Sequence, residues 1–138
     1  MTDHAERVRS IGVGELGLAM GIELQEISAD HATARMPVHG NRQPFGLVHG
    51  GANVVLAETL GSMAAAVHAG PGRYPVGIEV NAAHHRSASD GYVYATATAL
   101  SLGRTLTTHE IVIVDEEGRR TCTARLTCFL RDQAQNPT

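Results

Sequence analysis

The sequence contains no lysine and few aromatic residues. All 11 basic side chains of the 138-residue chain are arginine, and aromatic residues make up 4% of it. The formal net charge is -3, and no run of basic residues or row of aromatic residues is present. Domains that bind nucleic acid carry a basic face and often present aromatic rings for stacking. The composition therefore argues against a nucleic-acid partner.

Two further absences concern secretion and membranes. The first nine residues carry charges of both signs and have no apolar core segment, unlike a secretory signal peptide. The most apolar stretch, residues 51–69, contains Asn53, Glu58 and several small residues, so it makes a poor transmembrane span. From these observations we expect a cytoplasmic protein that has no membrane partner.

Cysteine is scarce as well. Cys122 and Cys128 are six residues apart in one predicted strand, which separates them by about 20 Å at about 3.3 Å per residue. That distance is too long for a disulfide between them. Both share strand parity with Ala124, Leu126 and Leu130, so we expect two thiols in the core without a redox role.

Residues 51–69 form the longest predicted helix, about 28 Å at about 1.5 Å per residue. The helix is apolar on nearly every side, which is typical of a helix enclosed by other elements. Glu58 lies in its middle, where a charged carboxylate is costly unless it is paired or hydrogen-bonded. Glu58 either pairs with an arginine on a wet side of the helix or faces a pocket. Ser62, at i+4, shares its face.

The remaining chain is rich in strand patterns, and a loop over residues 39–50 is long enough to suggest a functional role. We predict one α+β domain over residues 1–138, with a lead-in over 1–20 that is irregular or a weak helix and a frayed tail over 131–138. A curved antiparallel sheet of five or six strands would wrap around the helix, and its exposed edges predict oligomers. The predicted strands are 22–28, 32–38, 76–86, 92–102, 107–114 and 119–130.

The loop and helix together carry a long motif that resembles a known family. The motif is Gln43-Pro44-Phe45-Gly46-Leu47-Val48-His49-Gly50-Gly51-Ala52, followed by Leu56-Ala57-Glu58-Thr59-Leu60-Gly61-Ser62. With residues 77–87 and 101–104, it resembles the hotdog-fold acyl-CoA thioesterases, in the PaaI-like branch that carries a helix glutamate. Within that branch it is most similar to the dihydroxynaphthoyl-CoA thioesterases and to the proofreading thioesterase of enterobactin synthesis.

The resemblance implies a catalytic set. The backbone N–H of Gly50, at the positive end of the helix, would hold the thioester oxygen. Glu58 would act as nucleophile or general base. Gln43 would orient the thioester or the water, His49 would bond near the carbonyl, and Ser62 would assist at the acyl group. Without the resemblance, Gln43 could simply fix its own loop and His49 could be a polar residue at the helix start.

The resemblance also implies a substrate-binding set. His84 shares strand parity with Val76, Ile78 and Val80, which places it on the helix side, where the family has a histidine that lines the acyl pocket. His84 and the adjacent His85 point to opposite faces of a strand, so we expect no metal site. Met63 would line the acyl pocket, and the pantetheine arm and phosphates of CoA would contact Arg86, Ser87, Gly103 and Arg104.

The function implied is hydrolysis of an aromatic acyl-CoA thioester, in particular 1,4-dihydroxy-2-naphthoyl-CoA of menaquinone biosynthesis, to the free acid and CoA. A broad proofreading thioesterase for acyl-CoAs or acyl carrier proteins is one alternative, and a non-catalytic acyl-CoA-binding module is another. No cofactor is implied, because CoA belongs to the substrate. In the family one site draws residues from two subunits, so we expect a dimer, and a dimer of dimers as in a homotetramer, with sites at the interface.

Overall fold

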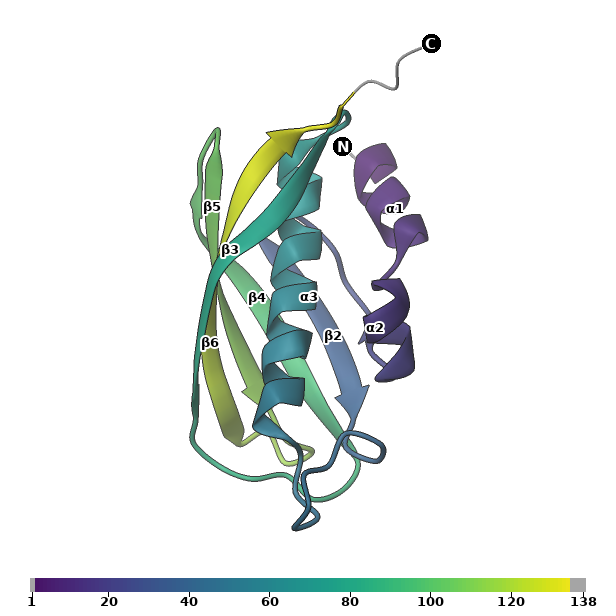
Figure 1. Ribbon diagram of the computed structural model, residues 1–138, viewed down its shortest axis with the longest axis vertical. Coiled ribbons are helices and arrows are strands. Elements are labelled where there is room, and N and C mark those ends of the chain that lie inside the picture. The colour runs from purple at the N-terminus through teal and green to yellow at the C-terminus, as the bar shows by residue number, and fades with distance from the viewer. Residues whose placement is uncertain (1, 135–138) are drawn as a thin grey trace.

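The computed structural model describes residues 2–134, which form a curved antiparallel sheet around one long helix (Figure 1). Six strands lie in the order β1-β2-β4-β5-β6-β3, and helix α3 packs along their inner face. This confirms the predicted architecture. The elements are α1 (Thr2–Ile11), α2 (Gly14–Ala19), β1 (Glu23–Leu24), β2 (His31–Pro37), α3 (Gly50–Ala69), β3 (Arg73–His84), β4 (Tyr92–Leu102), β5 (Leu106–Val114) and β6 (Arg120–Asp132).

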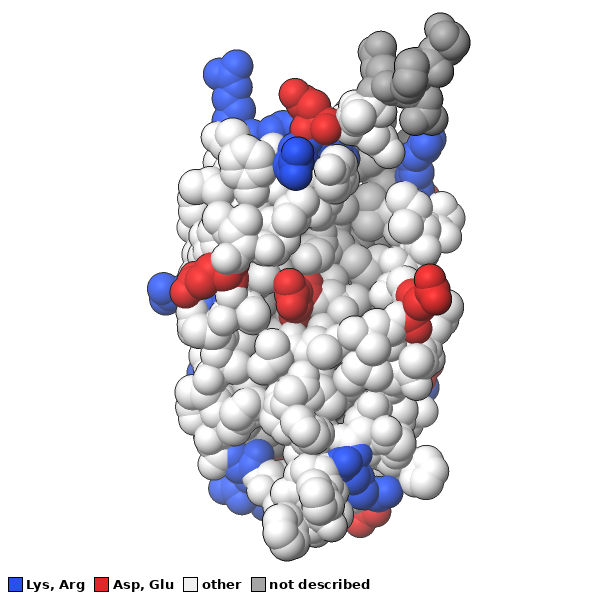
Figure 2. Space-filling view, in the orientation of Figure 1, with Lys and Arg blue, Asp and Glu red and all other residues white. Residues whose placement is uncertain are grey.

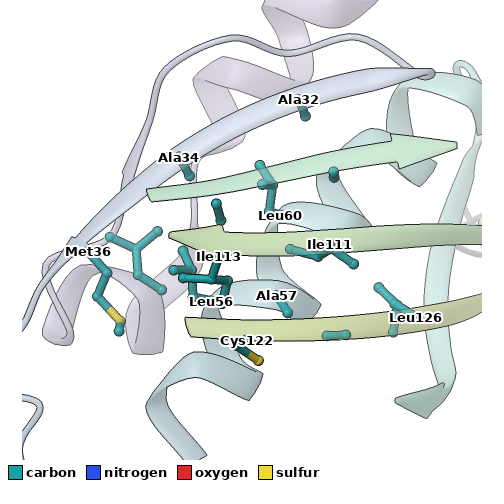
Figure 3. Close-up of a cluster of buried hydrophobic side chains, with 14 of the residues drawn as sticks. Ala32, Ala34, Met36, Leu56, Ala57, Leu60, Ile111, Ile113, Cys122 and Leu126 are labelled. Atoms are coloured by element: carbon teal, nitrogen blue, oxygen red, sulfur yellow. The ribbon is translucent and has the colours of Figure 1, made fainter. Parts of the chain in front are cut away.

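The core lies between α3 and the inner face of the sheet, as Figure 3 shows. Every second residue of each central strand points toward the helix, because side chains alternate across a strand. Small residues on β2 and large ones on β5 and β6 together fill the space, and each fully buried leucine or isoleucine contributes about 1.5–3 kcal/mol. The side chains in this layer include Ala32, Ala34, Met36, Leu56, Leu60, Ile111, Ile113, Cys122 and Leu126.

A bulge in β3 changes which residues face the helix. The pairing of β3 with β6 shifts register between Gly77 and Glu79. Gly77 therefore faces α3, Ile78 is 57% exposed, and Val80 packs against the core. The expectation that Ile78 shares the inner face with Val80 was wrong, since a single inserted residue reverses the alternation. His84 lies beyond the bulge and keeps its predicted side.

The N-terminal segment is more ordered than the irregular lead-in considered for residues 1–20. Helices α1 and α2 pack on the side of α3 that the sheet leaves open (Figure 1). Val8 of α1 is 4% exposed, and the Nε2 atom of His4 lies 3.1 Å from the carbonyl oxygen of Ala66 on α3. These contacts anchor the segment over the second half of the central helix.

Two other strand limits differ from the sequence prediction. The strand expected over residues 22–28 is reduced to Glu23–Leu24, because Thr33 bonds both Gln25 and Glu26 through its backbone and breaks the regular ladder. The tail expected to fray from residue 131 is paired through Asp132 of β6. The part of that expectation that concerns residues 135–138 lies outside the described residues.

Helix α3 begins and ends where the sequence predicts. His49 caps its first turn, and Gly70, with φ of +80°, ends it before Pro71. The helix is less enclosed than expected, since Glu58 and Ser62 are only half-buried. Among the described residues, no helix has the length and hydropathy needed to cross a membrane.

Candidate active site

A hollow of about 380 Å³ lies at the N-terminal end of α3, between the loop that precedes the helix and the end of β3. We call it the amide pocket. Its lining contains many hydrogen-bond donors and no carboxylate, so it suits a group that carries negative charge. It brings together five of the predicted residues, Gln43, Gly50, His84, Arg86 and Ser87, with Leu47, Val48, Asn53 and His85.

Gly50 presents the first amide of α3 to this pocket. No hydrogen-bond acceptor for its N–H is found among the residues that the structure describes. The first amides of a helix have no partner inside the helix and lie at its positive end. A side chain here would crowd the pocket, because a Cβ on Gly50 would lie 3.1 Å from Nε2 of His84. The glycine thus keeps the amide open to a ligand.

His49 has a structural role and keeps a free donor. Its Nδ1 atom accepts a hydrogen bond from the N–H of Gly51 at 2.8 Å, which caps the helix. A neutral imidazole that accepts at Nδ1 carries its proton on Nε2. His49 is therefore a polar residue at the helix start, as one interpretation expected, and its Nδ1 atom has that role. His49 is exposed and is not among the residues that line the amide pocket, so only its Nε2–H is left for a ligand.

The side chain of Gln43 is also held by hydrogen bonds to nearby backbone groups. Its Oε1 atom accepts hydrogen bonds from the backbone N–H groups of Phe45 and Leu47. The side chain therefore stabilises its own loop, as the simpler interpretation expected. Because the oxygen is used internally, the NH₂ group is the part of Gln43 that can contact a ligand in the amide pocket.

Glu58 lies in a different hollow of about 400 Å³, between α3 and the residues that join α1 to α2. In residues 2–134 no cation lies within ion-pair distance of its carboxylate, so pairing with an arginine is not what stabilises it. The carboxylate lies against Gly77 of β3, where a Cβ would be 2.6 Å from Oε2. Ser62 and Met63 line the same hollow, so the shared face predicted for Glu58 and Ser62 is confirmed.

Ser62 also lies near a buried thiol. Its Oγ atom is 3.9 Å from the Sγ atom of Cys128. Burial raises the pKa of the Cys128 thiol, and this outweighs the opposing contact with Ser62. The thiol therefore stays neutral, and Cys122 is likewise buried with a raised pKa. Both cysteines are free core residues, as predicted.

One chain does not bring Glu58 and Gly50 to the same thioester. The two residues are eight positions apart on α3, which corresponds to a rise of about 12 Å and a rotation of about 80°. They also line separate hollows. The described chain therefore holds the oxyanion donors and the carboxylate of the predicted site as two separate halves.

A third hollow, of about 430 Å³ and mostly apolar, continues along α3 from Ser62 and Met63. Its other walls include Val8 and Ile11 of α1 and Ala66 of α3. The sequence analysis missed the contribution of α1. The spacing of Val8 and Ile11, three residues apart on a predicted helical turn, was the available signal.

Gly103 and Arg104 lie far from the amide pocket, at the turn between β4 and β5. A Cβ on Gly103 would be 2.7 Å from the carbonyl oxygen of Leu106, so this glycine is required by the turn itself. The carbonyl oxygen of Arg104 accepts a hydrogen bond from Arg73. Within one chain, neither residue contributes to the hollows that hold the other site residues.

Charged groups are sparse on the face that carries α3. Figure 2 shows arginine side chains near the two ends of this face and separate acidic groups across its middle. His85 lines the amide pocket together with His84, because β3 ends at His84 and the alternation of faces ends with it. The Nε2 atom of His85 lies 2.9 Å from Oγ1 of Thr123.

Comparison with known proteins identifies the class. The model of the thioesterase superfamily matches residues 45–122. Proofreading thioesterase EntH of Cronobacter turicensis is 48% identical over 122 residues, which are 88% of this chain and 89% of that protein. EntH of Cronobacter sakazakii is 46% identical over the same length.

Solved structures agree with this. The thioesterase HI1161 of Haemophilus influenzae superposes with a TM-score of 0.87 at 36% identity, over 97% of this chain and 94% of that one. A mutant of thioesterase PA1618 of Pseudomonas aeruginosa superposes with a TM-score of 0.86 at 40% identity, over 93% of this chain and 94% of that one. The chain belongs to the thioesterase superfamily, has the hotdog fold and is a thioester hydrolase. The predicted family, fold and enzyme class are confirmed.

Proposed function

We propose that the chain hydrolyses acyl thioesters of CoA or of an acyl carrier protein in a proofreading role, with aromatic acyl groups as its preferred substrates. The observation that carries this proposal is the open N–H of Gly50 in a pocket of donors without a carboxylate. Such donors stabilise the oxyanion that forms when a thioester carbonyl is attacked. The proofreading role is supported by the name of the relatives at 48% and 46% identity.

In the proposed mechanism, the thioester carbonyl accepts from the N–H of Gly50, and the ring N–H of His49 and the amide of Gln43 complete the polar contacts. Glu58 supplies the carboxylate, either as the base that takes a proton from water or as the nucleophile. Ser62, on the same helix face as Glu58, contacts the acyl group or the water. The reaction needs no cofactor, because CoA or the carrier arm arrives with the substrate.

We propose that the carboxylate comes from a second subunit. The separation of Glu58 from Gly50 on one helix supports this, and so does the position of β3 at the edge of the sheet. A long, open edge strand readily pairs with another copy of itself. Such a dimer would bring the Glu58 of one chain to the amide pocket of the other, and two dimers would form a tetramer.

The substrate would enter with its polar arm outward. Arg86 and Ser87 lie exposed in the lining of the amide pocket, where they suit the pantetheine arm or the phosphates of CoA. Gly103 and Arg104 would reach the CoA only from the partner chain. The acyl group would then contact His84 at the amide pocket and Met63 beside Glu58.

1,4-Dihydroxy-2-naphthoyl-CoA, the substrate that would place the enzyme in menaquinone biosynthesis, is a second candidate supported by the resemblance of the motif. Steady-state release of thiol separates the two candidates, using dihydroxynaphthoyl-, benzoyl- and straight-chain acyl-CoA with wild type and Glu58→Ala. Turnover of several aryl thioesters that is lost in the variant supports proofreading. Turnover of the naphthoyl thioester alone supports the biosynthetic role, and turnover that survives the substitution contradicts both.

A further inference from the structure

Arg42 lies next to Gln43 in the loop before α3, and the mechanism gives it no role. Its Nε and Nη2 atoms donate hydrogen bonds to the carbonyl oxygen of Ser89 at 3.2 and 2.9 Å. The Nη2 atom also lies 3.3 Å from Oδ1 of Asp90. One guanidinium group therefore joins the loop before α3 to the segment between β3 and β4, 47 residues further along the chain.

The two segments that Arg42 joins both contribute to the amide pocket. Gln43, Leu47 and Val48 belong to the loop before α3, and residues 84–87 belong to the end of β3 and the stretch after it. Both segments cross the end of the molecule at which α3 begins (Figure 1). Arg42 does not line the amide pocket itself, so it can affect a bound substrate only through the residues that it holds.

The stretch from residue 87 to residue 90 has few other attachments. It forms no helix or strand, and Ala88 is its one buried residue. In the described part of the chain, its one hydrogen bond besides those of Arg42 runs from the N–H of Val48 to the carbonyl oxygen of Ala88, at 2.8 Å. Segments with few hydrogen bonds and little burial open locally at a low cost in free energy. Arg42 therefore supplies most of the hydrogen bonds that hold this stretch in place.

The loop before α3 is held without Arg42. The Nδ2 atom of Asn41 donates to the carbonyl oxygens of Met20 and Pro37 at 2.7 and 2.8 Å. Gly50 is part of α3 itself. The oxyanion donor should therefore stay in place when the side chain of Arg42 is removed.

We infer that Arg42 is a positioning residue for the arm of the substrate. By holding Ser89, it fixes the nearby Arg86 and Ser87, which the proposed function assigns to the pantetheine arm or the phosphates of CoA. This inference rests on the proposed function. It predicts that loss of Arg42 weakens binding of the arm and spares the chemistry at the thioester.

The test compares benzoyl-CoA with benzoyl-N-acetylcysteamine, which carries the same thioester but lacks the nucleotide and most of the pantetheine arm. Arg42→Ala should raise KM for benzoyl-CoA about tenfold, the effect of one hydrogen bond to a charged group, and leave kcat near wild type. The value of kcat/KM for the short thioester should stay unchanged. An equal loss on both thioesters would overturn the inference and assign Arg42 to the reacting centre or to the fold. An unchanged KM for benzoyl-CoA would overturn it as well.

Two further variants separate the contacts of Arg42. Arg42→Lys should also raise KM for benzoyl-CoA, because an ammonium group lacks the planar fork that places two N–H groups on one carbonyl oxygen. Asp90→Asn should have little effect, because the Asp90 carboxylate is 90% exposed and an exposed ion pair contributes little. A large rise in KM in Asp90→Asn with wild-type KM in Arg42→Lys would contradict a role for the bonds to Ser89.

Arg9→Ala is the matched control. Arg9 also donates to a backbone carbonyl oxygen, that of Gln25 at 3.0 Å, and lies 3.6 Å from the exposed carboxylate of Glu6. Its side chain is 38% exposed, against 31% for Arg42, and it lines none of the hollows described above. This variant should leave the kinetics of both thioesters unchanged.

Trypsin reports on the position of the segment without turnover. Cleavage after the exposed Arg86, followed by mass spectrometry of the two fragments, should be faster in Arg42→Ala than in wild type and Arg9→Ala. Equal cleavage rates would overturn the inference. Absence of hydrolysis of either thioester by wild type would contradict the proposed function, while the cleavage rates and the calorimetric Kd of CoA in wild type and Arg42→Ala would still decide the role of Arg42.

Discussion

The carboxylate of Glu58 lies directly against the backbone of Gly77, so close that a single methyl group on Gly77 would be 2.6 Å from Oε2. Gly77 faces the helix because the bulge in β3 begins there. The bulge and the glycine together make room for the carboxylate between helix and sheet. The position of Glu58 thus depends on β3 as well as on its own helix.

Replacing Gly77 by alanine should displace the carboxylate of Glu58 and lower kcat about 10²-fold, because small displacements of a reacting group are costly. The fold should survive, since the atom displaced is the end of a flexible side chain. Steady-state kinetics and thermal unfolding measure the two effects.

Gly61→Ala provides the contrast to Gly77→Ala. Its Cβ would be 2.7 Å from a methyl carbon of Leu126 in the core, so it should lower the melting temperature and leave kcat of the folded protein near wild type. If Gly77→Ala retains wild-type kcat, the contact with Gly77 does not position Glu58.

Because the two ring nitrogens of His49 have different roles, we expect substitutions there to affect stability and kcat separately. His49→Ala removes the helix cap and should lower the free energy of unfolding by about 1 kcal/mol, in addition to lowering kcat. His49→Asn keeps a capping oxygen, but its NH₂ group does not reach as far as the Nε2–H donor of histidine, so it should lower kcat and leave stability near wild type. Equal kcat in His49→Asn and wild type would show that His49 acts only as a cap.

The cysteines should be unreactive in the folded protein. Burial raises the pKa of both thiols, and Cys122 and Cys128 are each 0% exposed. A thiol-reactive disulfide reagent at pH 8 should therefore label neither cysteine before unfolding and both in denaturant. Rapid labelling of the native protein, measured by thionitrobenzoate release, would contradict the burial of these side chains.

His109 predicts a pH dependence of stability. Burial lowers its pKa below the ordinary 6.5, and a hydrogen bond from Nε2 to the carbonyl oxygen of Ala29 opposes this only in part. Below pH 6.5 the unfolded state gains a proton that the folded state does not, so stability is full above that pH and falls as the pH drops. The melting-temperature difference between wild type and His109→Gln should therefore shrink from pH 8 to pH 5, and a constant difference would contradict this.

Much of the fold could be predicted because its signals are local. The helix from Gly50 to Ala69 has a cap, an apolar composition and a glycine stop, and β4 alternates over its first half, so both were predicted with nearly correct limits. The bulge at Ile78 and the short β1 could not be predicted, since both depend on pairing with a neighbouring strand. The residue pattern of one strand does not show where its pairing with a neighbouring strand shifts register.

The candidate site was predicted as a set of residues, and the resemblance implied that one site draws residues from two subunits. In the structure Gln43 and Gly50 line one hollow and Glu58 lines another. The role of α1 and the place of Asn53 in the amide pocket were missed. Both result from tertiary packing, which leaves no motif at either position.

The central claim is that Gly50 and Glu58 act together only across two subunits. Trans-complementation tests it directly, with Glu58→Ala and Gln43→Ala chains that are each strongly impaired. Refolding an equal mixture should restore about a quarter of wild-type activity, because half of the dimers are then mixed and one of their two sites is intact. Mixed samples that remain as inactive as the separate variants would show that each site is built from one chain, and would contradict the account.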